Sequence, residues 1–288
     1  MRVALLHNSA AGGEDHTDTE LIALLEREGH GVEHVVSHVA DLTAALHDRA
    51  CDLVVVAGGD GTVGRTACQL AGWQVPIAIL PLGTANNTAA ALRLPRRAKK
   101  AVSSWHDAER VPFDLGLLND GSEQVRFAEC VGWGVFAQTI VEARQRDSAS
   151  SVKQTLKRDR RLFRSLLAST EPRPYRVEVD GRDCSGSYVL VEVLNISLLG
   201  PQLPLSPHSN PSDGQFEVVL VTSEERAAVD RVAKTGAPDP GYRTERGRRI
   251  RIAADDGVLH RDGKVIRHAR GTRSFELSAE PAAIHYLR

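Results

Sequence analysis

Residues 53–62 read Leu-Val-Val-Val-Ala-Gly-Gly-Asp-Gly-Thr and carry the strongest structural signal in the chain. The unbroken apolar run Leu53–Ala57 is typical of a strand that is buried on both faces of a parallel sheet. The turn Gly58-Gly59-Asp60-Gly61-Thr62 follows directly, at the strand's carboxyl end, where such sheets bind ligands. Its glycines let the backbone approach a phosphate, and Thr62 opens a helix whose N-terminal dipole favours an anion. The stretch therefore predicts a phosphate-binding loop in an α/β domain.

Strands and helices alternate around this stretch. Short apolar runs at Val3–Leu6, Val32–Val36 and Ile77–Leu80 are separated by segments with helical spacing of their apolar residues. Alternation of this kind predicts an α/β domain with an open parallel sheet, which we place over residues 1–110.

The pattern changes after residue 110. Asp120-Gly121 and Asp180-Gly181 are hairpin signals between strand-like runs, and they predict an antiparallel β-rich, sandwich-like domain over residues 111–288. We expect one helical insertion at 151–168 and two closing strands at 275–277 and 284–287. The final residues of this domain are expected to pack back on the first domain.

A second loop strengthens the prediction of a phosphate site. The strand at Ile77–Leu80 is followed by Pro81-Leu82-Gly83-Thr84-Ala85-Asn86-Asn87, which offers a glycine, a hydroxyl and two amides. Two such loops at the ends of neighbouring strands form a crevice for phosphates. Asp60 in the first loop is suited to hold Mg²⁺ or to orient a reacting hydroxyl, although a strand-to-helix turn also accounts for a lone Gly-Gly-Asp-Gly.

The paired loops resemble the diacylglycerol-kinase catalytic-domain superfamily, which includes soluble bacterial lipid kinases and sphingosine and ceramide kinases. NAD kinases and phosphofructokinases share the Gly-Gly-Asp-Gly loop but not the second loop in this form. The resemblance extends over nearly the whole chain. Its further segments are Asn8-Ser9-Ala10-Ala11-Gly12-Gly13, Phe113-Asp114-Leu115-Gly116, Pro207 to Phe216 with Asp213-Gly214, and His260-Arg261-Asp262-Gly263-Lys264.

This resemblance implies an enzyme of lipid metabolism that takes ATP in the α/β domain and a lipid in the β-rich domain. The γ-phosphoryl group would pass to a lipid hydroxyl such as that of diacylglycerol, with Mg²⁺ balancing charge. Asp262 matches the family's proposed general base, and Asp60 is its catalytic partner. Asp60, Asp114 and Asp213 are the implied metal ligands. The implied nucleotide-binding residues are Asn8, Gly58, Gly59, Gly61, Thr62, Gly83, Thr84 and Asn86.

Several positions depart from the family pattern and leave three hypotheses open. The family's Asn-Glu after the first loop is Gly64-Arg65, an acid of the second loop is Asn87, and an acid of the Asp-Asp-Gly segment is Ser212. Lys264 replaces the glutamate of Asp-Gly-Glu, and its charge is expected to lower the pKa of Asp262. The chain is a lipid kinase, a kinase for a soluble hydroxylated acceptor such as NAD, or a nucleotide- or lipid-binding protein without catalysis.

The composition of the chain indicates which classes of partner and which cellular compartment to expect. With 36 basic and 37 acidic residues, the net charge is -1, which disfavours nucleic acid. Apolar runs are short and the four cysteines lie far apart, so we expect a cytoplasmic protein with neither a zinc site nor disulfides. The basic amphipathic segment 151–168 is interpreted either as a solvated helix face or as a transient contact with a membrane surface. A homodimer is left open.

Overall fold

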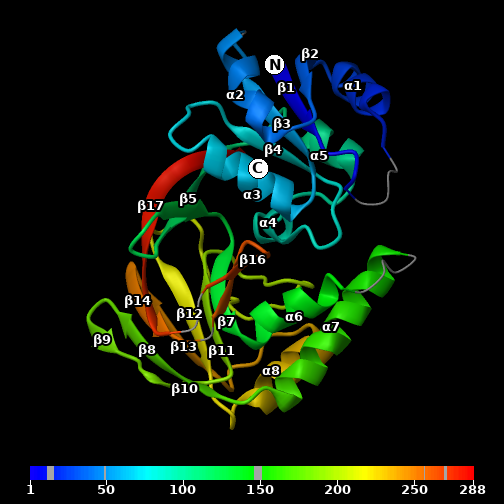
Figure 1. The fold of residues 1–288 in the computed structure, drawn as a ribbon. Helices are drawn as coiled ribbons and strands as arrows, with labels where there is room; N and C mark the ends of the chain where they lie inside the picture. Colours follow the sequence, from blue (N-terminus) through cyan, green and yellow to red (C-terminus); the bar gives the residue numbers. More distant parts are fainter. Residues whose placement is uncertain (12–15, 49, 146–150, 256, 269–270) are drawn as a thin grey trace. The chain divides into compact units, whose positions relative to one another are not determined.

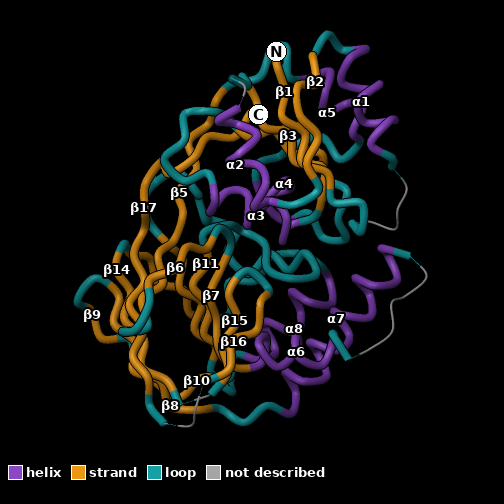
Figure 2. The backbone as a smooth tube through the Cα atoms, turned by 45° about the horizontal axis from the view of Figure 1, so that its top comes forward, coloured by secondary structure: helices purple, strands orange, loops and turns teal. Residues whose placement is uncertain are grey.

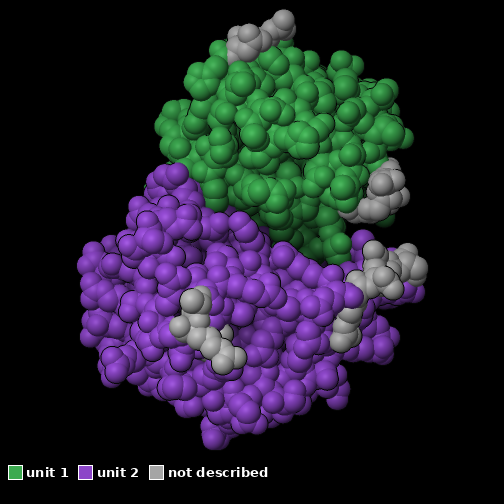
Figure 3. Space-filling view, in the orientation of Figure 1, with its two compact units in different colours: residues 1–113, 281–288 green, residues 114–280 purple. Residues whose placement is uncertain are grey.

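The computed structural model describes residues 1–11, 16–48, 50–145, 151–255, 257–268 and 271–288. Their contacts divide the chain into two compact units, which Figure 3 colours separately. Unit 1 comprises Met1–Phe113 and Pro281–Arg288, and unit 2 comprises Asp114–Glu280. Among the described helices, none is both long and apolar enough to cross a membrane.

A parallel sheet forms the centre of unit 1, in the order β2-β1-β3-β4 (Figure 1). The predicted open parallel α/β sheet is therefore confirmed. The strands are β1 (Arg2–His7), β2 (Gly31–Val36), β3 (Leu53–Gly58) and β4 (Ile77–Pro81). The helices are α1 (Asp18–Arg27), α2 (Val39–Asp48), α3 (Asp60–Gln69), α4 (Asn87–Ala91) and α5 (Ala98–Ser104).

The core of unit 1 explains why β3 reads as a continuous apolar run. Every residue of β3 is buried, because the strand lies between β1 and β4 and is covered on both faces. Leu53 and Val55 share a cluster with Leu21 and Leu25 of α1 and with Val102 of α5. Helix α1 begins in a capping box, in which Thr17 and Glu20 bond to each other's backbone N–H groups.

Unit 2 is built from two antiparallel layers, which confirms the sandwich-like prediction. One layer is a six-stranded sheet in the order β13-β12-β11-β7-β15-β16. The other has the order β10-β8-β14-β17, with β9 beside β8 and the hairpin of β5 and β6 beside β17. The strands are β5 (Arg110–Asn119), β6 (Gln124–Phe127), β7 (Cys130–Gly134), β8 (Arg173–Val179), β9 (Arg182–Asp183), β10 (Gly186–Tyr188), β11 (Leu190–Leu194), β12 (Phe216–Val221), β13 (Arg243–Gly247), β14 (Arg249–Ala254), β15 (Val258–Arg261), β16 (Lys264–Arg267) and β17 (Arg273–Leu287).

The inner strands β7, β11 and β12 of the six-stranded sheet are buried on both faces. Trp133, Val191 and Val193 face the other layer and join its core with Ile252 and Phe275. The alternate residues of the same strands belong to a second cluster, shared with α6 (Val135–Ala143), α7 (Val152–Ser169) and α8 (Arg226–Thr235). Figure 2 shows these three helices grouped on one side of the strands of unit 2. The face of β7, β11 and β15 that lies under the helices is therefore shielded from water, although Glu192 and His260 lie on it.

One strand differs from the prediction. The two closing strands expected at 275–277 and 284–287 are a single strand, β17. Its first residues pair with β14, and Tyr286 pairs in parallel with Ile77 of β4. The exposed residues Pro281 and Ala282 interrupt the apolar pattern in its middle, and Ala282 has a left-handed backbone (φ 49°).

Candidate functional site: two glycine loops and three aspartates

The two glycine loops of unit 1 touch each other backbone to backbone. Strands β3 and β4 end in register, with Gly58 opposite Pro81, so both loops leave the same edge of the sheet. A Cβ atom placed on Gly83 would lie 2.3 Å from the Gly59 Cα, and one placed on Gly59 would lie 3.0 Å from the Gly83 Cα. Neither position has room for a side chain. The contact leaves backbone amides, rather than side chains, to line the ends of the two strands.

The strand β1 contributes the third part of this site. The backbone N–H of Asn8 donates to the Ala57 carbonyl at 3.0 Å, and its side-chain amide donates to the Thr62 hydroxyl at 2.9 Å. Gly12 and Gly13, predicted in the same loop, lie outside the described residues. Helix α3 begins at Asp60 with Gly59 as its N-cap, and no side chain caps it. The positive end of its dipole therefore lies at the glycine turn, which favours an anion there.

Asn86 and Asp60 hold the second loop. Asn86 has a left-handed backbone (φ 52°), and its amide oxygen accepts the Gly83 N–H at 2.9 Å while its amide nitrogen donates to the Gly83 carbonyl at 2.8 Å. The Asp60 carboxylate accepts the Thr88 N–H at 3.2 Å. Thr84 is exposed at the loop's surface. The predicted nucleotide-binding residues of unit 1 are thus gathered at the ends of β1, β3 and β4.

In unit 2, the structure brings Asp114 to the segment that contains Asp213. The buried Asp114 carboxylate accepts the Gly214 N–H at 2.6 Å, and the Asp114 N–H donates to the Pro211 carbonyl at 2.6 Å. The Asp213 carboxylate forms an ion pair with Arg246. An arginine on that carboxylate competes with a cation, so Asp213 does not fit a metal ligand in this arrangement.

Asp262 lies in the turn between β15 and β16. Its carboxylate accepts three backbone N–H groups, those of Ala128 at 2.8 Å, Glu129 at 2.8 Å and Cys130 at 3.1 Å. Burial raises the pKa of Asp262, and the three N–H donors act against this rise. The expectation that Lys264 lowers this pKa is wrong: the Lys264 side chain is exposed, and the loss of water around the buried carboxylate outweighs the stabilising donors.

The positions that depart from the family pattern have ordinary structural surroundings. Gly64 is buried in α3, whereas Arg65 is exposed on the same helix. Asn87 is buried at the start of α4. The Ser212 hydroxyl donates to the Asn210 side chain at 2.8 Å.

Two residues near Asp114 and Asp213 were missed from the sequence. The buried Asn195 amide donates at 2.8 Å to the carbonyls of both Asp114 and Ala128, and it thereby joins β5, β11 and the chain before β7. The feature of the sequence that could have indicated Asn195 is its position directly after the apolar run of β11. Arg246 contacts Glu217 at 3.2 Å in addition to Asp213, and no local pattern links these residues.

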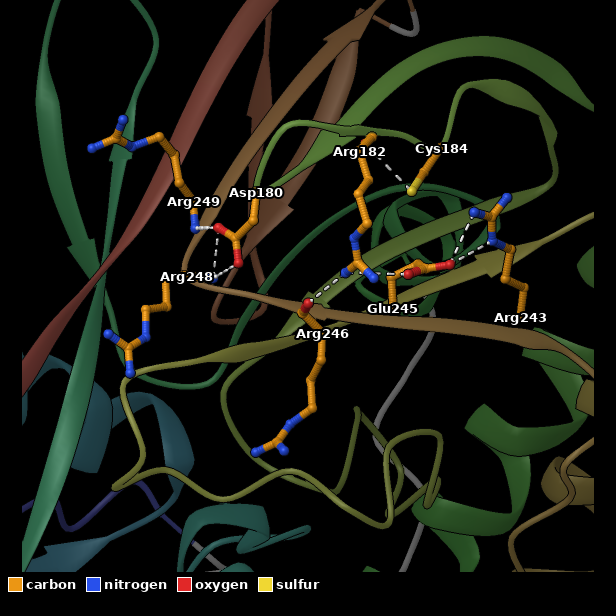
Figure 4. A network of polar contacts seen from close by, with 8 residues as sticks. All are labelled: Asp180, Arg182, Cys184, Arg243, Glu245, Arg246, Arg248 and Arg249. Carbon is orange, nitrogen blue, oxygen red and sulfur yellow. Dashed lines mark hydrogen bonds and ion pairs between the residues drawn. The ribbon is translucent and has the colours of Figure 1, made fainter.

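Arg246 belongs to a polar network at the edge of unit 2, shown in Figure 4. The Arg182 side chain donates to the Arg246 carbonyl at 2.9 Å and lies 3.4 Å from Glu245, which also pairs with Arg243 at 2.9 Å. Nearby, the Asp180 carboxylate accepts the backbone N–H groups of Arg248 and Arg249. These bonds join the β8–β9 turn to β13 and β14. The arginines of this network therefore serve mainly to hold these segments together.

The comparisons with known proteins match two successive parts of the chain. Residues 2–118 match the model of the diacylglycerol kinase catalytic domain, and residues 137–288 match that of the YegS C-terminal NAD kinase beta sandwich-like domain. A diacylglycerol kinase of Mycobacterium tuberculosis is 26% identical over 95% of this chain and 86% of its own length. A YegS-like lipid kinase of Pectobacterium atrosepticum is 27% identical over 98% of this chain and 94% of its own.

A solved structure, that of a diacylglycerol kinase from Bacillus anthracis, superposes with a TM-score of 0.74 at 19% identity. The match covers 99% of this chain and 96% of that one. The two proteins therefore share their fold from end to end.

Proposed function

Because this chain belongs to the diacylglycerol-kinase catalytic family, a family of lipid kinases, we propose that it transfers the γ-phosphoryl group of ATP to a lipid hydroxyl. The hydroxyl of diacylglycerol is the acceptor that the names of its relatives favour. The observation that carries the proposal is the backbone contact between Gly59 and Gly83 beside the uncapped start of α3.

This contact supports nucleotide binding for a physical reason. Phosphoryl transfer needs donors that are positioned in advance around phosphate oxygens, and backbone N–H groups at a helix start supply them without reorganisation. A side chain on either glycine would push the two loops apart and displace these backbone N–H groups, so the close contact supports a preorganised phosphate site. Bound ATP with Mg²⁺ would supply the phosphoryl group and neutralise its charge. In unit 1, the Asp60 carboxylate lies at the glycine turn and is suited to such a cation, and Asp114 remains the ligand that the family resemblance implies in unit 2.

Asp262 is the proposed general base for the acceptor hydroxyl. As the hydroxyl oxygen forms its bond to the γ-phosphorus and the bond to ADP breaks, the hydroxyl proton passes to the Asp262 carboxylate. Its raised pKa supports this role, because a carboxylate held only by N–H donors would be a weak base. The same three donors fix the orientation of the carboxylate.

A substrate that sits in a bilayer requires contact with a membrane surface, and we assign this contact to the first half of α7. Arg160 and Arg164 of this helix are engaged with the Pro201 carbonyl and with Asp230. Lys153, Lys157 and Arg161 are exposed, and Val152 exposes 40% of its surface beside them. An apolar residue together with exposed basic groups suits an anionic lipid surface.

The test is an incubation of the purified protein with γ-labelled ATP, Mg²⁺ and a total lipid extract. The proposal expects label in a lipid, and the chemical class of that lipid identifies the acceptor. Label in a soluble acceptor such as NAD would favour the second hypothesis. Binding of ATP without transfer to any acceptor would favour a protein that has lost catalysis.

A further inference from the structure

Three metal-binding side chains meet in unit 2, under the helices that cover the six-stranded sheet. Cys130 of β7, Glu192 of β11 and His260 of β15 place one donor atom each within 4.8 Å of one another. All three side chains are buried, and Glu192 and His260 expose no surface. They come from three neighbouring strands, and each is more than 60 residues from the next along the chain. No short sequence motif therefore contains them.

Gly132 makes this arrangement possible. In the sheet, Glu192 pairs with Gly132 from one side and His260 pairs with it from the other. A Cβ atom on Gly132 would lie 2.1 Å from the Glu192 carboxylate. The glycine thus leaves the space in which the carboxylate extends over β7 toward the imidazole. Both carboxylate oxygens lie against the His260 Nε2, at 2.9 and 3.0 Å, so the two groups form a hydrogen-bonded pair beside the Cys130 thiol.

The electrostatics of this cluster favour a cation. Burial raises the pKa of Glu192, and it raises the pKa of Cys130 well above its ordinary value. The carboxylates of Glu192, Asp262 and Glu129 add to the rise at Cys130, so the thiol lies in a negative field. The surroundings are otherwise apolar, with the Phe136 ring 5.1 Å from that of His260. A divalent cation would bring the sum of a thiolate, a carboxylate and a neutral imidazole to zero.

We propose that Cys130, Glu192 and His260 form a binding site for one Zn²⁺ ion. Sulfur, imidazole nitrogen and carboxylate oxygen are the donors that zinc takes in proteins. When the ion replaces the hydrogen bond between Glu192 and His260, the second oxygen of Glu192 can supply the fourth donor. The ion ties β7, β11 and β15 together directly beside the turn that carries Asp262. The competing account is a hydrogen-bonded Glu192–His260 pair beside an inert thiol, and it predicts no metal.

The test uses the full chain produced in minimal medium in which Co²⁺ replaces Zn²⁺. Cobalt adopts the same tetrahedral site and, unlike zinc, gives a visible spectrum and a thiolate-to-metal absorption band. We expect one cobalt ion per chain by elemental analysis and a thiolate band in the purified protein. The protein purified from zinc medium should unfold at a higher temperature than the same protein treated with a chelator.

Matched variants locate the metal. Cys130→Ser should lose the thiolate band, and Glu192→Gln should release cobalt to a chelator at least about tenfold more readily. Cys184→Ser is the control, because Cys184 is also a buried free cysteine but lies in the other core cluster of unit 2. It should keep both the metal and the band. A parent protein purified without cobalt, or a thiolate band that survives in Cys130→Ser, would overturn the proposal, even if a variant failed to fold.

Discussion

The substitution Gly83→Ala tests the crevice through a single methyl group. The new Cβ would lie 2.3 Å from the Gly59 Cα and 2.9 Å from the Asn86 amide oxygen. Carbon atoms in contact are about 3.5–4.0 Å apart, so the two loops must separate by about 1.2–1.7 Å. Misplacement of catalytic parts by about 1 Å costs about 100-fold in rate. We therefore expect kcat/KM for ATP to fall at least about 100-fold, or about 2.7 kcal/mol of transition-state stabilisation.

The assay measures phosphoryl transfer from γ-labelled ATP together with ATP affinity and the free energy of unfolding in urea. Overpacking should cost about 1–3 kcal/mol of stability, which leaves a folded protein to study. Gly31→Ala is the matched control, since a Cβ there has no neighbour within 4 Å and should change neither binding nor turnover. A folded Gly83→Ala protein with the parent's ATP affinity and turnover would refute the assignment of the crevice.

Three further predictions concern other parts of the chain. Asp262→Asn should abolish transfer and leave ATP affinity nearly intact, whereas full activity in this variant would exclude Asp262 as the base. The double reversal Lys157→Glu with Arg161→Glu should weaken binding to anionic vesicles, as should added salt; equal vesicle binding by both proteins would leave α7 a solvated helix. Burial lowers the pKa of His30, so its folded-state pKa lies below its unfolded value of about 6.5. The free energy of unfolding should therefore be at its full value above about pH 6.5 and should decrease as the pH falls toward the folded-state pKa of His30. The decrease should be smaller in His30→Phe, and the midpoints of urea unfolding at each pH measure it.

Local patterns predicted the elements that local physics determines. The apolar run at 53–57 is β3, and the amphipathic segment expected at 151–168 is α7, Val152–Ser169. A strand that is buried on both faces has a continuous run of apolar residues, and a helix that is buried on one face has apolar residues at helical spacing. Both patterns can be recognised from residues that are close together in the sequence. The two glycine loops could be placed because each directly follows such a strand.

Features that depend on distant partners could not be predicted in the same way. The middle of β17 contains exposed Pro281 and Ala282, and its two ends pair with strands far away in the sequence. The contact of Arg246 with Glu217 and that of Glu192 with His260 arise from sheet register, which no spacing in the chain encodes. The pKa of Asp262 was misjudged for the same reason: Lys264 is adjacent in sequence, but burial of the carboxylate dominates.

The most direct test of the account is transfer of label from γ-labelled ATP to diacylglycerol in vesicles, with NAD offered at the same concentration in the same reaction. The account predicts a labelled phospholipid, no labelled NAD, dependence on Mg²⁺, and loss of the product in Gly83→Ala. Label on NAD alone, or no transfer by a folded protein that binds ATP, would contradict the claim that this chain is a lipid kinase.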